Sequence, residues 1–127
     1  MATVNPTITH HAGADGDETI FRAVWTLTST NVDGAPVNIP EWADKTWHMT
    51  GTLGSAVCAV QGAALNVEAD FAALSNAADG AALTMAAVPS CKLQLENPAF
   101  ARPKLTTAGS GASLVVTLTA VRPAMRR

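Results

Sequence analysis

Strict alternation of apolar and polar residues is the sequence feature that most limits how this chain can fold. Residues two apart lie on the same face of an extended strand, and the segment 18–28 alternates over its whole length. One of its faces is apolar and the other mostly polar: Phe21, Ala23, Trp25 and Leu27 against Ile20, Arg22, Val24, Thr26 and Thr28. Segments 45–53, 91–96 and 112–121 repeat the period. Although alanine is abundant and favours helices in isolation, the pattern predicts β-strands.

About eight such strands are separated by turn signals, which is typical of an antiparallel β-sandwich or jelly roll. We expect a turn at residues 31–34, where Asp33-Gly34 tolerates positive φ, and a tight hairpin at Gly54-Ser55. A single helical turn fits residues 41–44. Residues 65–74 fit one bent strand or two short ones, and a short helix within the alanine-rich stretch 63–87 remains an open alternative. Pro103 predicts an edge strand or a bulge.

The length of 127 residues predicts one domain. We expect residues 1–17 to form an extended N-terminal arm with one β piece at 3–9. Residues 18–122 then form the sandwich, and 123–127 form a basic C-terminal tail.

Composition excludes several classes of protein. With 48% hydrophobic residues, 14% charged residues and a net charge of −2, the chain is too apolar for a disordered protein and too poor in Lys and Arg for a nucleic-acid binder. No apolar run is long enough for a membrane helix, and the first eighteen residues lack the pattern of a signal peptide, so we expect neither membrane insertion nor export. Low charge and many threonines indicate a surface covered by neighbouring molecules; a GC-rich genome is the equally weighted alternative.

No catalytic or metal-binding pattern emerges, so we expect neither enzyme activity nor a metal or cofactor. His10-His11 and the acidic residues Asp15, Asp17 and Glu18 lack the glycine and terminal glutamate of a calcium loop, and adjacent histidines on an extended chain point in opposite directions. Cys58 and Cys91 lie in two predicted strands. A bridge between them is geometrically possible, but two buried free thiols are favoured. Neither thiol has a recognisable catalytic partner in its local sequence.

The three tryptophans divide by their position in the alternation. Trp25 and Trp47 fall on the inward series, whereas Trp42, between Glu41 and Asp44, is predicted to be an exposed anchor for a protein partner.

Charge is segregated along the chain. Residues 1–44 hold six acidic groups and one basic group, whereas residues 91–127 hold six basic groups and one acidic group. The basic end includes Arg122, Arg126 and Arg127. This asymmetry fits complementary contacts between molecules; a solvated tail lying near the acidic segment of the same subunit fits equally well.

Two sequence blocks resemble a known family. They are DGAPVNIPEWADKTWHMTGTLG at 33–54, and LENPAFARPKL at 95–105 with SLVVTL at 113–118. Together they resemble small proteins of tailed bacteriophages encoded near the major capsid protein, some of which are jelly-roll-like capsid decoration or cement proteins. The resemblance covers roughly residues 20–122. It breaks after Gln61-Gly62, where the family tends to continue with a polar stretch and a Trp, and this chain has Ala63 to Asn66 and then Phe71.

The resemblance implies a structural virion protein, made in the host cytoplasm, that binds the outer capsid surface and cements contacts between major capsid protein subunits. We expect it also to associate with itself as a dimer or trimer. The candidate contact residues combine the arm, the Trp42 region and the tail: Asp15, Asp17, Glu18, Glu41, Trp42, Asp44, Arg122, Arg126 and Arg127. The alternative is a carbohydrate-binding β-sandwich on the virion that uses Trp42 for host adhesion.

Overall fold

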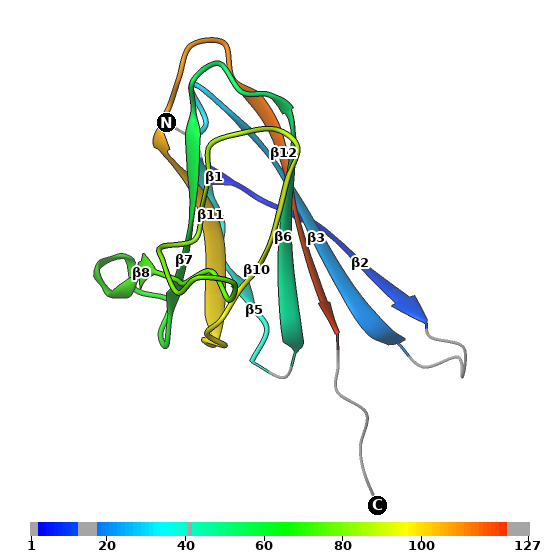
Figure 1. Cartoon of the computed structure of the whole chain (residues 1–127). Coiled ribbons are helices and arrows are strands. Elements are labelled where there is room, and N and C mark those ends of the chain that lie inside the picture. The colour runs from blue at the N-terminus through cyan, green and yellow to red at the C-terminus, as the bar shows by residue number, and fades with distance from the viewer. Residues whose placement is uncertain (1–2, 13–17, 41, 122–127) are drawn as a thin grey trace, which may run out of the picture.

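The structure is a computed structural model that describes residues 3–12, 18–40 and 42–121. Two β-sheets pack face to face in it (Figure 1). The five-stranded sheet has the order β10 (Ser90–Leu93), β6 (Ala43–Thr52), β12 (Ser113–Val121), β3 (Glu18–Thr28), β2 (Thr7–Ala12). The seven-stranded sheet has the order β1 (Thr3–Val4), β4 (Asp33–Gly34), β11 (Phe100–Thr107), β7 (Val57–Ala63), β8 (Ala72–Ala73), with β5 (Val37–Asn38) on β11 and β9 (Thr84–Met85) on β7. The predicted all-β sandwich is confirmed.

The core lies between the sheets and is built from the inward series of the long strands. Strand β12 pairs with β3 along its whole length and with β6 on its other side. Its Leu114, Val116 and Leu118 are fully buried. Trp25 and Trp47, both predicted to point inward, are fully buried and stack with ring centroids 5.5 Å apart. Alternation therefore placed the apolar faces correctly.

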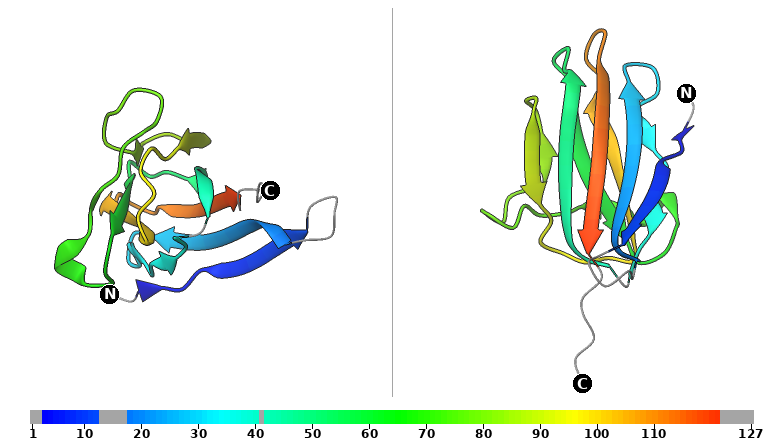
Figure 2. Two further views of the ribbon diagram at one scale, coloured as in Figure 1. Left: turned by 90° about the horizontal axis from the view of Figure 1, so that it is seen from below. Right: turned by 90° about the vertical axis from the view of Figure 1, so that its right-hand side faces the viewer.

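The described part of the predicted N-terminal arm belongs to the sandwich. Strand β1 pairs in parallel with β4, and β2 pairs antiparallel with β3 (Figure 2). Residues 3–12 thus contribute a strand to each sheet, because pairing satisfies backbone groups that β3 would otherwise leave unpaired at the sheet edge. The parallel β1–β4 pair also departs from the expected antiparallel pattern.

The turn predicted at residues 31–34 needs correction. The turn after β3 spans Thr28 to Asn31, whose backbone groups exchange two hydrogen bonds of 3.1 and 3.2 Å. Asp33 and Gly34 instead form β4, where Asp33 pairs with Lys104 of β11.

Gly54 and Ser55 do form a tight turn, with φ of 56° and 65° and a 2.9 Å bond from the Ala56 N–H to the Leu53 carbonyl. Positive φ at both central residues is the feature of a type I′ turn. The flanking strands β6 and β7 enter different sheets, so this turn is an arch and not a hairpin.

The alanine-rich segment 63–87 contains no α-helix. It holds one 3₁₀ turn, η1 (Glu68–Asp70), the short strands β8 and β9, and an isolated bridge between Ser75 and Ala82. Leu74 and Leu83 are buried; the Leu74 N–H donates a hydrogen bond to the Val60 carbonyl of β7, and the Val60 N–H donates one to the Leu83 carbonyl. Two buried leucines nine residues apart do not make the continuous apolar stripe that stabilises a helix.

The expected helical turn at 41–44 is also absent over its described part. Ala43 begins β6. Asp44, the second residue of β6, has φ of 50°, a left-handed conformation that a right-handed helical turn does not contain.

Candidate functional site

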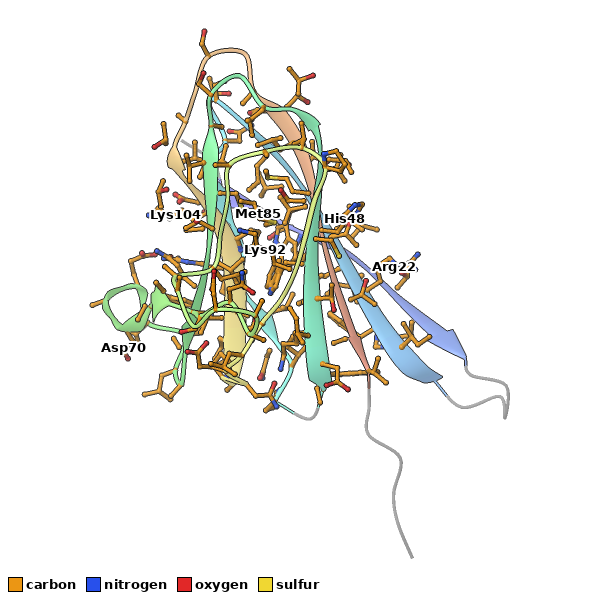
Figure 3. All side chains as sticks on the ribbon, in the orientation of Figure 1. Arg22, His48, Asp70, Met85, Lys92 and Lys104 are labelled. Atoms are coloured by element: carbon orange, nitrogen blue, oxygen red, sulfur yellow. The ribbon has the colours of Figure 1, made fainter. Side chains whose placement is uncertain are left out.

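The outer face of the five-stranded sheet is a broad surface that the described chain leaves uncovered. It consists of the side chains of β2, β3, β6, β10 and β12 that point away from the seven-stranded sheet, and we call it the threonine face. The right-hand view of Figure 2 looks onto it, and Arg22 and His48 mark it in Figure 3. Nine threonines share this face by strand register: Thr7, Thr9, Thr26, Thr28, Thr46, Thr50, Thr52, Thr117 and Thr119.

The threonine face is almost free of charge. Arg22 is the one permanently charged residue among its outward positions in 7–11, 20–28, 46–52, 90–93 and 113–121, and it pairs across the strands with Thr119 and Thr9. Leu93, Val115 and Val121, on the same face, are 43%, 36% and 38% exposed. A β-sheet face in contact with water usually carries charged side chains. The composition of this face is therefore closer to that of a contact surface.

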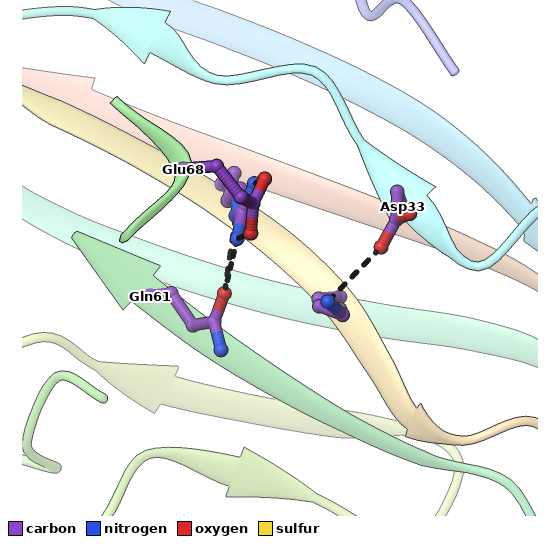
Figure 4. Close-up of polar contacts among 5 residues, drawn as sticks. Asp33, Gln61 and Glu68 are labelled. Carbon is purple, nitrogen blue, oxygen red and sulfur yellow. Dashed lines mark hydrogen bonds and ion pairs between the residues drawn. The ribbon is translucent and has the colours of Figure 1, made fainter. Parts of the chain in front are cut away.

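The outer face of the seven-stranded sheet is different because the chain folds back over it. Arg102 of β11, only 6% exposed, donates two hydrogen bonds to the Gln61 Oε1 of β7 and two to the carboxylate of Glu68 in η1, at 2.7–3.0 Å (Figure 4). Its guanidinium lies 4.0 Å from the ring centroid of Phe71. Arg102 thus attaches the segment around η1 to the sheet.

The resemblance to the phage proteins breaks after Gln61-Gly62, and the segment that differs includes Phe71. The ring of Phe71 is the one that lies under the Arg102 guanidinium. The Arg102 hydrogen bonds hold the pKa of the Glu68 carboxyl below its usual value. A second ion pair on this face joins Lys104 to Asp33 at 3.5 Å.

We expect Arg102→Ala to lower the free energy of unfolding by about 2 kcal/mol, because it removes charge-assisted hydrogen bonds and the packing on Phe71. Urea unfolding followed by circular dichroism measures the loss. Glu68→Gln is the matched control: it keeps the side-chain shape and should lose less, since the Glu68 side chain is 74% exposed. Equal losses in the two variants would contradict an anchoring role for Arg102.

Trp42 does not form the exposed anchor that the sequence predicted. It is 3% exposed and packs against the rings of Phe21 and His10, with centroids 5.5 and 5.8 Å away. The error came from its acidic neighbours, which describe the local charge but not the direction of the indole. A large apolar ring at the open end of a sandwich gains more free energy by closing the core than by facing water.

The other predicted contact residues are not brought together by the described structure. Asp44 is exposed in β6, one residue after the strand begins. Glu18 begins β3, and its backbone pairs with Ala12. The remaining six lie outside the described residues: Asp15, Asp17, Glu41, Arg122, Arg126 and Arg127.

Lys45 is a buried cation that the sequence analysis missed. It is 2% exposed and donates a 2.8 Å hydrogen bond to the backbone carbonyl of Trp42. Burial lowers the pKa of its ammonium group to about 8. The signal was present in the alternation, because Lys45 has the same parity as the inward-pointing Trp47.

Both cysteines are free, as predicted, but only one is buried. Cys58 lies in the core, where burial raises the pKa of its thiol to about 12. Cys91 is exposed on β10, on the threonine face opposite His48. The expectation that both thiols are buried was therefore wrong for Cys91, because β10 is an edge strand whose residue 91 has the outward parity.

Across the described ranges, no three His, Cys, Asp or Glu side chains gather closely enough to hold a metal ion. No helix in the same ranges has the length and apolar character needed to cross a membrane. In comparisons with known proteins, neither a family model nor a curated protein matches this chain.

Proposed function

We propose that this protein is a structural component of a bacteriophage particle that binds the outer capsid surface and stabilises contacts between capsid subunits. The sequence blocks at 33–54 and 95–118 carry the proposal, through their resemblance to phage decoration proteins. Strands β6 and β12, one from each block, pair over most of their length, and β4 and β5 from the first block pair with β11 from the second. The two blocks therefore form one continuous unit that extends through both sheets.

Two surfaces support a binding role. They are the threonine face and the outer face of the seven-stranded sheet, to which Arg102 attaches the segment around η1. A protein that reinforces a shell needs a rigid body with surfaces that bury enough area against neighbours, about 1,200–2,000 Å² in total for a specific contact. A sandwich with a broad, nearly uncharged face fits this requirement, whether that face meets the shell or a second copy of the chain. Many identical copies on one particle add their individual contacts.

The carbohydrate-binding alternative loses the feature that favoured it. It depended on an exposed tryptophan as a stacking platform for sugar rings. All three tryptophans of the chain are described, and each is at most 3% exposed. We therefore do not propose glycan binding.

The copy number in purified particles tests the proposal. Quantitative mass spectrometry of particles should find this chain in hundreds of copies, at a fixed ratio to the major capsid protein. A dozen copies would place the protein in the neck, tail or a fibre, and absence from particles would refute the proposal.

A binding assay tests the predicted contact residues. Capsids lacking the protein should recover heat resistance when it is added back. We expect the triple variant Arg122→Ala, Arg126→Ala, Arg127→Ala to bind them more weakly. The triple variant Arg122→Lys, Arg126→Lys, Arg127→Lys, which keeps the positive charge of the tail, is the matched control. Equal binding by the two triple variants would exclude the charge of the tail from the contact.

A further inference from the structure

We propose that two copies of this chain associate face to face through their threonine faces, as a dimer with two-fold symmetry. The inference assigns a surface to self-association, and it stands whether or not the protein binds a capsid. Its basis is the size, the chemistry and the charge pattern of this one face.

The threonine face has the dimensions of a specific interface. Its strands β10, β6, β12, β3 and β2 hold 4, 10, 9, 11 and 6 residues, which at about 3.4 Å per residue and about 4.8 Å between strands give a face of about 650 Å². Stable protein–protein interfaces bury about 600–1,000 Å² on each partner. A face of this size can form a complete interface without help from another element.

The side chains suit packing between sheets. Along the central strand β12, the outward residues are Ser113, Val115, Thr117, Thr119 and Val121. Short and β-branched side chains of this kind let two sheets approach to about 10 Å, as they do inside a sandwich. Charged residues are depleted from the centres of protein interfaces, and the outward positions of 20–28, 46–52 and 113–121, in the middle of this face, carry neither an acidic residue nor a lysine. The exposed Asp44 lies at the end of β6.

The position of Arg22 favours a second copy as the occupant. Arg22 lies on β3, the strand next to β12. It pairs with Thr119, which is two residues beyond Thr117, the middle residue of β12. For a two-fold axis crossing at Thr117, two sheets about 10 Å apart would place the two Arg22 residues about 14–17 Å from each other. The two Arg22 side chains thus extend from positions that are not opposite each other, and a partner chosen by charge would find only one complementary site.

Solution mass and central substitutions test the dimer. Light scattering and sedimentation of the pure protein should give about twice the chain mass of 13.0 kDa. Val115→Arg or Thr117→Arg should weaken association at least about 100-fold, because each would bury an unpaired charge at the interface centre. Thr107→Arg, on an exposed position at the end of β11 in the other sheet, is the matched control and should leave the dimer intact. Circular dichroism verifies that each variant folds.

Crosslinking gives a second readout that does not depend on lost affinity. In a Cys91→Ser background, where Cys58 is buried, Thr117→Cys should be crosslinked between copies by a short bifunctional thiol reagent, and Thr107→Cys should not. The proposal would be overturned if the wild-type protein had the mass of a monomer at a concentration 100-fold higher than that used for crosslinking. A trimer, or a dimer that survives both arginine substitutions, would also overturn it, since each places the contact elsewhere. None of these measurements involves a capsid, so their failure leaves the capsid proposal untouched.

Discussion

Trp47→Ala is expected to lower the free energy of unfolding by about 4 kcal/mol, which is typical of a large aromatic side chain removed from a core. Trp47 is fully buried, its ring stacks on Trp25 at 5.5 Å, and its Nε1 donates a 2.7 Å hydrogen bond to the Gln94 Oε1. The substitution therefore removes packing between the sheets and also leaves the buried amide oxygen of Gln94 without its donor. Both effects act in the same direction.

A milder variant separates the two contributions. Trp47→Phe keeps a ring in the core but removes the N–H donor, so we expect a loss of about 2 kcal/mol from the smaller ring and the unpaired amide. Urea unfolding should be followed by far-ultraviolet circular dichroism, because tryptophan fluorescence itself changes. Thr107→Ala, at an exposed position at the end of β11 in the other sheet, is the control and should cost less than about 1 kcal/mol. A loss below 1 kcal/mol for Trp47→Ala would show that the two sheets do not depend on this stack.

The sequence predicted those parts of the fold that depend on one strand at a time. Strand β3 occupies residues 18–28 as expected, because its apolar face is long enough for alternation to be unambiguous. Alternation assigns faces but not neighbours. It therefore could not show that the Gly54-Ser55 turn leads β7 into the opposite sheet, nor that β1 and β2 pair with different sheets.

The candidate site also has parts that a single strand reveals and parts that depend on contacts between distant segments. The outward series of β3, from Ile20 to Thr28, was identified from the sequence, but its continuation across the neighbouring strands appears only when the register is known. The Arg102 anchor gives no local signal, because its partner Glu68 is 34 residues away. Trp42 was placed wrongly since its neighbours in the chain are acidic, whereas its neighbours in space are Phe21 and His10.

Lys45→Met is expected to raise the free energy of unfolding at pH 7, by about 2 kcal/mol. Burial lowers the pKa of Lys45 to about 8 in the folded protein, against about 10.4 in an unfolded chain, and each unit of difference corresponds to about 1.4 kcal/mol. At pH 7 the wild-type protein keeps this charge in the core at a cost in stability. Methionine fills a similar volume without the charge, and the loss of the hydrogen bond to the Trp42 carbonyl offsets part of the gain.

The sign of the pH dependence follows from the same two pKa values. Between pH 8 and about 10.4 the unfolded chain binds a proton at Lys45 that the folded protein does not, so the stability of the wild type rises with pH through this window. The advantage of Lys45→Met should therefore shrink from pH 8 upward and disappear near pH 10.5. Cys58 acts in the opposite direction above pH 9, since its raised thiol pKa favours ionisation of the unfolded chain. Because wild type and variant share Cys58, this contribution cancels in their difference.

Urea unfolding of both proteins at pH 7 and pH 10.5 measures this difference directly. Lys45→Arg is the control that retains the charge: the guanidinium stays protonated at both pH values, so that variant should be less stable than Lys45→Met at each. A Lys45→Met protein that is less stable than wild type at pH 7, or a difference that does not change with pH, would mean that the ammonium group is not held at a cost in the core. The expected result would instead identify a residue that the sandwich keeps against its own stability, at the end where β6 begins beside Trp42.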